Sequence, residues 1–310
     1  MAEDGAKPTR LCAVSVDLDE IPFYRQIHGL SADGEASDHA VFDLALPRLG
    51  ELADALAMPL TLFVIGETLD RPQNGEKLRA MAEAGHELGN HTLGHRYDLT
   101  RLDRAAMQAE IEGAQSAIEK ATGVRPVGFR APGYTVTDDL LGLLQGFLYD
   151  SSVFPCPAYW GLKAAAMSMI RLRGRRSRSV LDTPKVLTAP RRPYRIGTPY
   201  WKKGEGALEL PIQVTPGLRL PFIGTSLTMA GPRGAKAMAR SLVGEPLVNL
   251  ELHGVDVLDE NDGLKALAEH QRDLKVPLAK KLDTLTAVVD TLREAGYTFV
   301  RLDQAAREFA

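Results

Sequence analysis

Two short motifs carry side chains that can do chemistry: one holds two aspartates and the other holds two histidines. Asp17 and Asp19 stand at the end of the first apolar run, and their side chains share one face if that run is a strand. His91 and His95 follow the run 86–90, and one helical turn would place both imidazoles on the same side. Imidazole and carboxylate groups are common ligands of transition metals. From the residues alone, the histidine pair can hold one cation, and the two carboxylates can converge at the carboxyl end of their strand, although an acid at a strand end can also simply form a turn.

Two further apolar runs end in basic residues that suit acid–base chemistry. Arg130 is followed by a Pro-Gly turn that includes Gly133 and Tyr134, and His253 ends the run 247–252. An arginine there can hold a carboxylate, and the turn can present backbone N–H groups; the residues alone assign no role to the histidine. Folds with parallel strands place their sites at the carboxyl ends of the strands, so we expect the four motifs to meet.

The elements that must position these motifs alternate between short apolar runs and amphipathic stretches. We predict strands at 11–16, 60–65, 86–90, 127–130, 147–149, 207–212, 247–252 and 298–302. We predict helices at 41–56, 76–84, 101–122, 138–144, 235–243 and 277–295. Thr137 is a predicted helix start and Gly123 a predicted helix stop. The alternation is typical of a mainly parallel sheet covered by helices, either closed into a barrel or open and doubly wound.

A single domain over residues 1–310 accounts for this pattern, because no repeat or clean linker interrupts it. Two segments break the alternation. Residues 18–40 read as a long polar loop after the first strand, and residues 155–206 as a longer insert rich in proline and arginine. Loops of this length inside a compact domain are usually functional or disordered. We therefore expect 18–40 to be an active-site loop and 155–206 to have a binding role.

Composition and charge narrow the class of protein. The chain has 310 residues, of which 45% are hydrophobic and 25% charged, and this excludes a disordered or collagen-like chain. The formal charge of −3 hides a segregated distribution, since residues 160–203 carry a net +11 and the other residues −14. The near-neutral total is therefore a cancellation, and an anionic partner is compatible with it.

The basic segment suggests what the insert contacts. Tryptophans flank it, and residues 164–173 change from apolar to basic, as an interfacial helix does. We expect it to bind an anionic membrane surface or a substrate phosphate; a solvated charged face is the simpler alternative, and no motif for nucleic acid accompanies the charge. The residues expected in this contact are Trp160, Arg171, Arg173, Arg175, Arg176, Arg178 and Trp201.

The ordered set of motifs resembles that of the NodB-homology polysaccharide deacetylases, carbohydrate esterase family 4. That family has an acidic first motif, an H-[ST]-x-x-H second motif, an R-x-P third motif and a late L-H motif. Residues 17–19, 91–95, 130–132 and 252–253 follow the same order here. The resemblance implies a distorted (β/α) barrel with a long basic insert, and a metal-dependent hydrolase that acts on the N-acyl amide of an amino sugar.

The resemblance also implies roles for the first two motifs and for the arginine. Asp19, His91 and His95 match the residues that bind one divalent metal, zinc in the first place, with cobalt, nickel or manganese as alternatives. Asp17 matches the catalytic base, and Arg130 matches the residue that orients it.

The remaining positions complete the implied site. His253 matches the general acid that protonates the departing amine. A backbone N–H near Gly133 or Tyr134 would stabilise the oxyanion. Asp150 resembles a later acidic motif of the family, for which we expect a supporting role.

The first motif departs from the common T-F-D-D-G of the family, because Leu18 separates the two acids. This spacing is similar to a D-x-D branch that includes deacetylases of cell-wall sugars, metal-independent allantoinase-like hydrolases, and deformylases of lipid-linked formamido-arabinose. The intact histidine pair favours a metal-dependent member. We expect a substrate linked to a polyprenyl phosphate or glycolipid. The alternatives are a soluble oligosaccharide deacetylase, a metal-independent hydrolase of a cyclic amide, and a non-catalytic binding protein with the same fold.

Two observations bear on the compartment. Residues 1–10 are polar, without the apolar core of a signal peptide, and no run approaches the ~20 apolar residues of a membrane span. Cys12 and Cys156 show neither a disulfide framework nor metal-ligand spacing. We expect a cytoplasmic protein that is peripheral at the inner membrane face.

Overall fold

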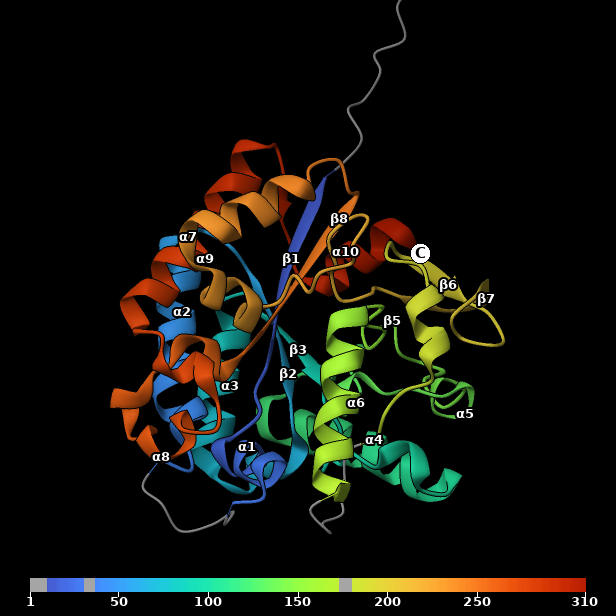
Figure 1. Ribbon diagram of the computed structural model, residues 1–310. Coiled ribbons are helices and arrows are strands. Elements are labelled where there is room, and N and C mark those ends of the chain that lie inside the picture. The colour runs from blue at the N-terminus through green and yellow to red at the C-terminus, as the bar shows by residue number, and fades with distance from the viewer. Residues whose placement is uncertain (1–9, 31–36, 173–179) are drawn as a thin grey trace, which may run out of the picture.

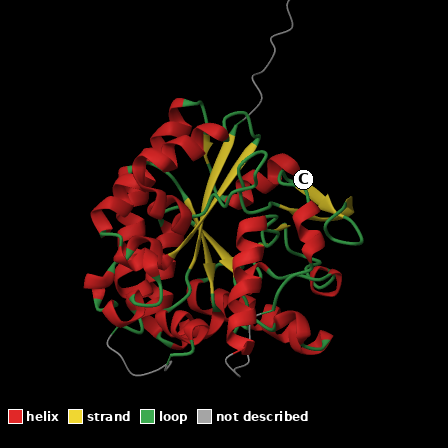
Figure 2. Ribbon diagram, in the orientation of Figure 1, coloured by secondary structure: helices red, strands yellow, loops and turns green. Residues whose placement is uncertain are grey.

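The computed structural model describes residues 10–30, 37–172 and 180–310, and its centre is one curled sheet (Figure 1). Within these residues the strands are β1 (Leu11–Asp17), β2 (Leu60–Val64), β3 (Glu87–Asn90), β4 (Gly128–Phe129), β5 (Tyr149–Asp150), β6 (Tyr194–Ile196), β7 (Lys203–Glu209), β8 (Leu247–His253) and β9 (Thr298–Phe299). The α-helices are α1 (Ile21–His28), α2 (Leu46–Ala55), α3 (Pro72–Glu83), α4 (Arg104–Thr122), α5 (Asp138–Leu141), α6 (Pro157–Leu172), α7 (Gly224–Ser241), α8 (Lys265–Ala268), α9 (Leu278–Glu294) and α10 (Leu302–Phe309). Figure 2 shows the strands at the centre with the helices outside them.

The strands follow the order β6-β7-β5-β4-β3-β2-β1-β8, and β9 pairs with β1. All these pairs are parallel except that between β6 and β7. The irregular segment after β7 bridges toward β8, because Ile212 N–H donates to Val153 O and Gln213 N–H donates to Asn249 O. The sheet is thus an incomplete barrel, which confirms the expected α/β fold and its distorted barrel.

All eight predicted strands are present, with ends displaced by a few residues. The predicted helix signals also hold. Thr137 Oγ1 accepts a hydrogen bond from Leu140 N–H at the start of α5, and Gly123 ends α4 with a φ of 78°. Three short elements, β6, α8 and α10, were not predicted, and they lie where the sequence pattern is weakest.

The described parts of residues 18–40 and 155–206 contain helices and strands that the alternation of apolar runs did not predict. The first segment contains α1, which has a proline in its first turn and ends at Gly29 with a φ of 70°. The second contains α6, β6 and β7. The interfacial helix suggested by the change from apolar to basic residues at 164–173 corresponds to α6, which begins earlier, at Pro157.

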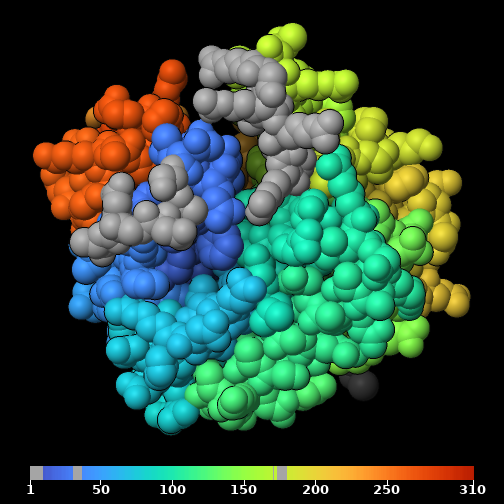
Figure 3. All heavy atoms as spheres, turned by 90° about the horizontal axis from the view of Figure 1, so that it is seen from below, coloured from blue at the N-terminus to red at the C-terminus, as the bar shows by residue number. Residues whose placement is uncertain are grey.

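The carboxyl ends of the central strands meet at one edge of the sheet. Every residue of β1 and β2 is buried, as expected for parallel strands covered on both faces. Asp17 at the end of β1 is in register with His253 of β8, and Asn90 of β3 with Phe129 of β4. In Figure 1 this edge points downward toward α1, and Figure 3 views the molecule from that side. The four motifs therefore open onto the same face.

Candidate metal centre and active site

Asp19, His91 and His95 converge just beyond the ends of β1 and β3. The Nε2 atoms of His91 and His95 lie 3.4 Å and 3.3 Å from Asp19 Oδ1. Each residue offers one ligand atom, and these atoms lie within 4.8 Å of one another. All three residues are buried. The triad is consistent with one divalent metal ion, since two imidazoles and one carboxylate leave positions open for water and substrate.

Polar atoms without partners indicate that the triad fits a cation. Asp19 Oδ1 and both ring nitrogens of His95 are buried with no hydrogen bond among the described residues, whereas buried polar atoms normally have one. His91 Nδ1 donates to Arg130 O at 2.8 Å, so its Nε2 lone pair faces Asp19. Burial lowers the pKa of His95 to about 4, which keeps that ring in the neutral form that binds metals.

The loop that carries the two histidines is not the helical turn predicted from their spacing. Thr92 and His95 have positive φ angles of 66° and 48°. Asn90 Oδ1 accepts a hydrogen bond from Thr92 N–H, and Thr92 Oγ1 accepts one from His95 N–H. Such side-chain bonds to the backbone stabilise tight turns. This turn brings the ring centroids of His91 and His95 to 4.8 Å, so the imidazoles meet by a different backbone path.

Asp17 lies beside the triad and is paired with Arg130. Arg130 Nη1 donates to Asp17 Oδ1 at 2.6 Å, and Asp17 Oδ2 lies 3.6 Å from His91 Nε2. Both residues are buried. Burial alone would lower the pKa of Arg130, but the charges of Asp17 and Glu251 raise it. The guanidinium thus fixes one oxygen of Asp17 and leaves the other directed at the triad.

Sequence reasoning missed the residues that hold Arg130. Arg130 Nη2 donates to Ser15 Oγ and Ser151 Oγ, each at 2.9 Å, and Nε donates to Ser151 O at 2.8 Å. The guanidinium also lies 4.2 Å from the centroid of the Phe63 ring. A Cβ at Gly89 would stand 2.6 Å from that ring, so this position needs glycine. These residues come from different strands, and no sequence spacing relates them to Arg130.

His253 ends β8 and pairs with Glu251, a residue that sequence reasoning left without a role. His253 Nδ1 lies 2.8 Å from Glu251 Oε1. Tyr134 Oη donates to the same oxygen at 3.0 Å and lies 3.3 Å from His253 Nε2. Burial alone would lower the pKa of His253, but Glu251 raises it well above its usual value. The buried Glu251 carboxylate therefore favours the charged form of the His253 imidazole.

The turn after Arg130 contains two consecutive left-handed residues. Gly133 has a φ of 60° and Tyr134 a φ of 57°. For tyrosine this conformation costs about 1 kcal/mol or more, and it persists where surrounding contacts hold it. Tyr134 N–H donates to Ala131 O at 3.2 Å, so its hydrogen is engaged within the turn. Of the two predicted backbone donors, Gly133 N–H is the better candidate.

Asp150 lies on β5, away from the triad, and acts on the strand end that carries Arg130. Asp150 Oδ1 accepts from Ser152 Oγ at 2.6 Å, and Ser152 Oγ accepts from Ala131 N–H at 2.8 Å. Glu209 of β7 is in register with Asp150, and both side chains are fully buried. Burial beside Asp150 raises the pKa of Glu209 well above its usual value, so Glu209 holds a proton.

Residues 18–40 contribute aromatic side chains to the border of the site. The Phe23 ring lies 4.8 Å from His95, and the Tyr24 ring lies 6.3 Å from His253. Tyr97 contacts His95 from the other loop at 4.8 Å. Aromatic rings from two loops therefore pack against the histidines of the site.

The tryptophans of the insert face inward, which is a correction to their expected role as surface anchors. Trp160 Nε1 donates to Asp182 O at 2.9 Å, and Trp201 packs against Tyr200. Both tryptophans are half-buried, whereas Arg171 is exposed on α6. The remaining arginines expected in this contact lie outside the described residues, namely Arg173, Arg175, Arg176 and Arg178.

Part of the insert's charge is neutralised by the rest of the protein. Arg191 and Arg192 each form an ion pair with Glu245 at 2.7 Å. Glu245 lies outside the insert, so the net +11 of the sequence overstates the charge available to a partner. Among the described residues, none of the helices has the length and apolarity that a bilayer span requires.

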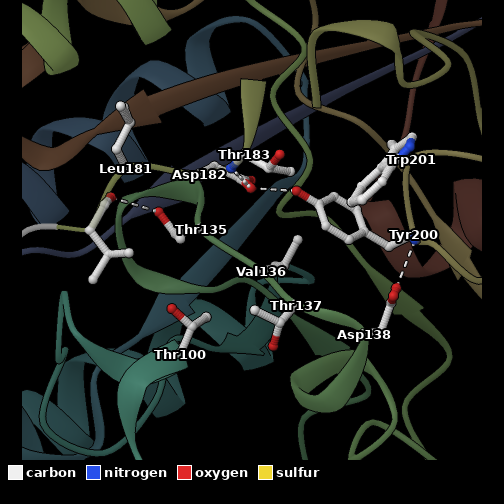
Figure 4. Close-up of a pocket in the computed structure, with 11 residues that line it drawn as sticks. Thr100, Thr135, Val136, Thr137, Asp138, Leu181, Asp182, Thr183, Tyr200 and Trp201 are labelled. Atoms are coloured by element: carbon white, nitrogen blue, oxygen red, sulfur yellow. Dashed lines mark hydrogen bonds between the residues drawn. The ribbon is translucent and has the colours of Figure 1, made fainter. Parts of the chain in front are cut away.

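A separate pocket of about 290 Å³ lies between the insert and the segment that follows Tyr134 (Figure 4). Thr135 and Asp138 line one side, and Asp182, Tyr200 and Trp201 line the other. Tyr200 Oη donates to Asp182 Oδ1, which ties the two parts of the insert together. The triad does not line this pocket.

Residues 43–149 match the family model for polysaccharide deacetylase. The matched segment contains His91, His95 and Arg130. Asp17, Asp19 and His253 lie outside it, and the structure brings them to the same place.

Curated relatives agree with this match. The chain is 31% identical over 153 residues to the peptidoglycan deacetylase-like protein FGM2 of Gibberella zeae. The aligned region covers 45% of this chain and 43% of the relative. It is 26% identical over 148 residues to the peptidoglycan deacetylase of Helicobacter pylori, covering 46% and 49%. It is 39% identical over 98 residues to a chitooligosaccharide deacetylase of Sinorhizobium fredii, covering 29% and 43%. The matches span less than half the length of these relatives.

Solved structures share the fold. A Mycobacterium smegmatis protein solved as a candidate polysaccharide deacetylase superposes with a TM-score of 0.62 and 20% identity, covering 99% of this chain and 92% of that one. A CE4 family pseudoenzyme of Bacillus anthracis gives a TM-score of 0.50 and 12% identity, covering 97% and 66%. Because a pseudoenzyme adopts this fold, activity has to be argued from the side chains.

Proposed function

We propose that the chain is a polysaccharide deacetylase and that it hydrolyses the N-acyl amide, acetyl or formyl, of an amino sugar; the match of residues 43–149 to the family model supports this. One observation carries this proposal. A buried Asp-His-His triad stands beside an Asp17–Arg130 pair, and the His253–Glu251 pair offers ligand atoms within 4.8 Å of one on Asp17. A metal site, a base and an acid are the three parts that metal-assisted amide hydrolysis needs.

In the proposed mechanism, Asp17 is the general base. Asp19, His91 and His95 would hold a divalent cation, which supplies Lewis acidity for the attacking water and the amide carbonyl. Arg130 fixes Asp17 Oδ1, so Oδ2 accepts the proton of the water. Gly133 N–H donates to the oxygen that becomes negative.

His253 is the general acid of the proposed mechanism. Glu251 accepts from Nδ1 and keeps the ring charged, so the proton on Nε2 goes to the departing amine. Tyr134, 3.3 Å from Nε2, limits where the ring can lie. The products are the free amine and a carboxylate, acetate or formate.

Zinc is the proposed metal, because a site of two imidazoles and one carboxylate with open positions suits it. Cobalt, nickel and manganese accept the same donors. Elemental analysis of the purified protein identifies the ion. Activity that survives complete removal of the metal would instead favour the metal-independent hydrolysis of a cyclic amide.

The test of the proposed function is an acyl-release assay. Purified protein is incubated with chitooligosaccharides, peptidoglycan glycan strands, and prenyl-phosphate-linked N-acetyl and N-formyl sugars, and acetate and formate are measured. We expect release from at least one of them, lost in Asp17→Asn. If the wild type with its metal bound released neither acetate nor formate from any of these substrates, the proposal would be refuted.

A lipid-linked substrate at an anionic membrane surface is the finer proposal. Its support is the outer face of α6, where Leu162, Met169 and Leu172 are 73%, 55% and 86% exposed. Met169 lies seven residues, or about two helical turns, after Leu162, and Leu172 lies three residues after Met169. The three side chains therefore form one apolar stripe. Arg171 and the arginine-rich sequence that follows supply charge for anionic lipid.

Vesicle sedimentation tests the membrane contact. We expect the wild type to bind phosphatidylglycerol vesicles, and Leu162→Gln, Met169→Gln and Leu172→Gln combined to weaken binding at least tenfold. Met229→Gln is the matched control, because Met229 is 54% exposed on α7. Equal binding by the triple variant and the wild type would contradict the proposal.

A further inference from the structure

The side chain of Lys163 reaches from α6 to the turn that follows Arg130. Lys163 Nζ donates to Gly133 O at 2.9 Å and to Thr135 Oγ1 at 3.2 Å. One ammonium group therefore holds the residues on both sides of Tyr134. A Cβ at Gly133 would lie 3.5 Å from Nζ and 3.0 Å from the Tyr97 ring, so the lysine and the turn are closely packed.

The turn needs such support. Gly133 and Tyr134 are both left-handed, a conformation that L side chains rarely adopt. Residues in this conformation persist where neighbouring contacts over-determine them, and they concentrate at functional sites. Burial lowers the pKa of Lys163 to about 8, which indicates that these contacts replace much of its hydration.

The same turn sends Tyr134 to the proposed general acid. Its phenol donates to Glu251 Oε1 at 3.0 Å and lies 3.3 Å from His253 Nε2. The Tyr134 ring packs against Tyr159, which also belongs to α6, with centroids 5.4 Å apart. The insert therefore contacts the catalytic face from two residues of one helix.

We propose that Lys163 is a positioning residue: it holds the Gly133–Thr135 turn so that the Tyr134 hydroxyl stays against the Glu251–His253 pair. This inference rests on the proposed function for its catalytic consequence. Lys163 touches neither the triad nor Asp17 in the structure, and it acts through the turn. The insert thus supports the active site as well as any surface contact it makes.

The test uses Lys163→Met, which keeps the aliphatic stem and removes the ammonium. We expect kcat to fall about ten- to a hundredfold with KM and bound metal unchanged, as for misplacement of a catalytic group. Lys163→Arg should recover part of the loss. Lys236→Met, at an exposed position of α7, is the matched control and should retain wild-type kcat.

A second measurement does not need activity. Protein labelled with 3-fluorotyrosine gives a ¹⁹F resonance for Tyr134, assigned by its disappearance in Tyr134→Phe. We expect Lys163→Met to shift this resonance and Lys236→Met to leave it in place. If Lys163→Met does not fold, Thr135→Val removes one of the two acceptors and should shift the resonance in the same direction.

The outcomes separate the two ideas. An unshifted Tyr134 resonance in a folded Lys163→Met overturns the role of Lys163, whatever the activity. Wild-type kcat in that variant also overturns it. A wild type that releases no acyl group from any substrate, together with a shifted resonance, overturns the proposed function and leaves the contact between Lys163 and the turn supported.

Discussion

Glu251 and His253, two residues apart on β8, point to the same side of the strand and form a hydrogen-bonded pair of 2.8 Å. Side chains at i and i+2 of a strand share a face, so the pair follows from the strand itself. The carboxylate is fully buried, whereas the imidazole reaches the edge of the site. In the proposed mechanism, the pair holds a charged imidazole that can protonate the departing amine.

Glu251→Gln should move the pH dependence of activity. Burial works against the charged imidazole, and Glu251 raises the pKa of His253 well above its usual value. Without that negative charge the pKa of His253 falls, and less of the acid form remains at alkaline pH. We expect the alkaline limb of the kcat/KM profile to move toward neutral pH, with about a ten- to hundredfold loss at pH 8. An unmoved limb would show that another group is the acid.

Asp17→Asn should abolish most activity and weaken the fold. We expect kcat to fall by about 10² or more, because the proposed base is gone. Arg130 remains buried with its ionic partner removed, so urea unfolding should show a loss of about 3 kcal/mol. Retention of wild-type turnover would contradict the role of Asp17.

Removal of the metal should cost activity and stability together. The orphaned atoms of Asp19 and His95 gain a partner when a cation binds, so chelation should lower the Tm and added zinc should restore it. At a free metal concentration a hundred times Kd, the stabilisation is about 2.7 kcal/mol. His95→Ala should bind no metal, whereas Asp17→Asn should keep it. If the Asp17→Asn variant also lost the metal, that result would show that Asp17 is itself a metal ligand.

Glu87 should make stability depend on pH. Burial and the nearby charge of Asp303 raise the pKa of Glu87 from 4.5 to about 7. Between these values the unfolded chain releases the proton while the folded protein retains it, so the free energy of unfolding falls as pH rises from about 4.5 to 7. The loss is on the order of 3 kcal/mol.

Glu87→Gln tests this by comparison of urea unfolding at pH 5 and pH 8. Its amide can still bond Thr61 and Tyr149, which hold Glu87 in the wild type. We expect the variant to lose less stability over this interval than the wild type. An equal loss in both proteins would assign the pH dependence to other groups.

The local sequence determined eight strands, most of the long helices and the motifs that end the strands, whereas α1, β6, α8 and α10 were not predicted. Apolar runs predicted the eight strands, and Thr137 and Gly123 predicted a helix start and a helix stop, because these signals depend on neighbouring residues alone. The convergence of Asp19, His91 and His95 could also be predicted, since the carboxyl ends of parallel strands meet at one edge.

Tertiary structure decided what surrounds those residues. Arg130 meets Asp17 across 113 positions of sequence, and Lys163 of α6 meets the turn across 30. The hydrogen bond from Trp160 to Asp182 and the pairing of Glu209 with Asp150 are likewise contacts between distant segments. Such contacts depend on how layers pack, and packing arises from the summed burial of many residues, which no short motif records.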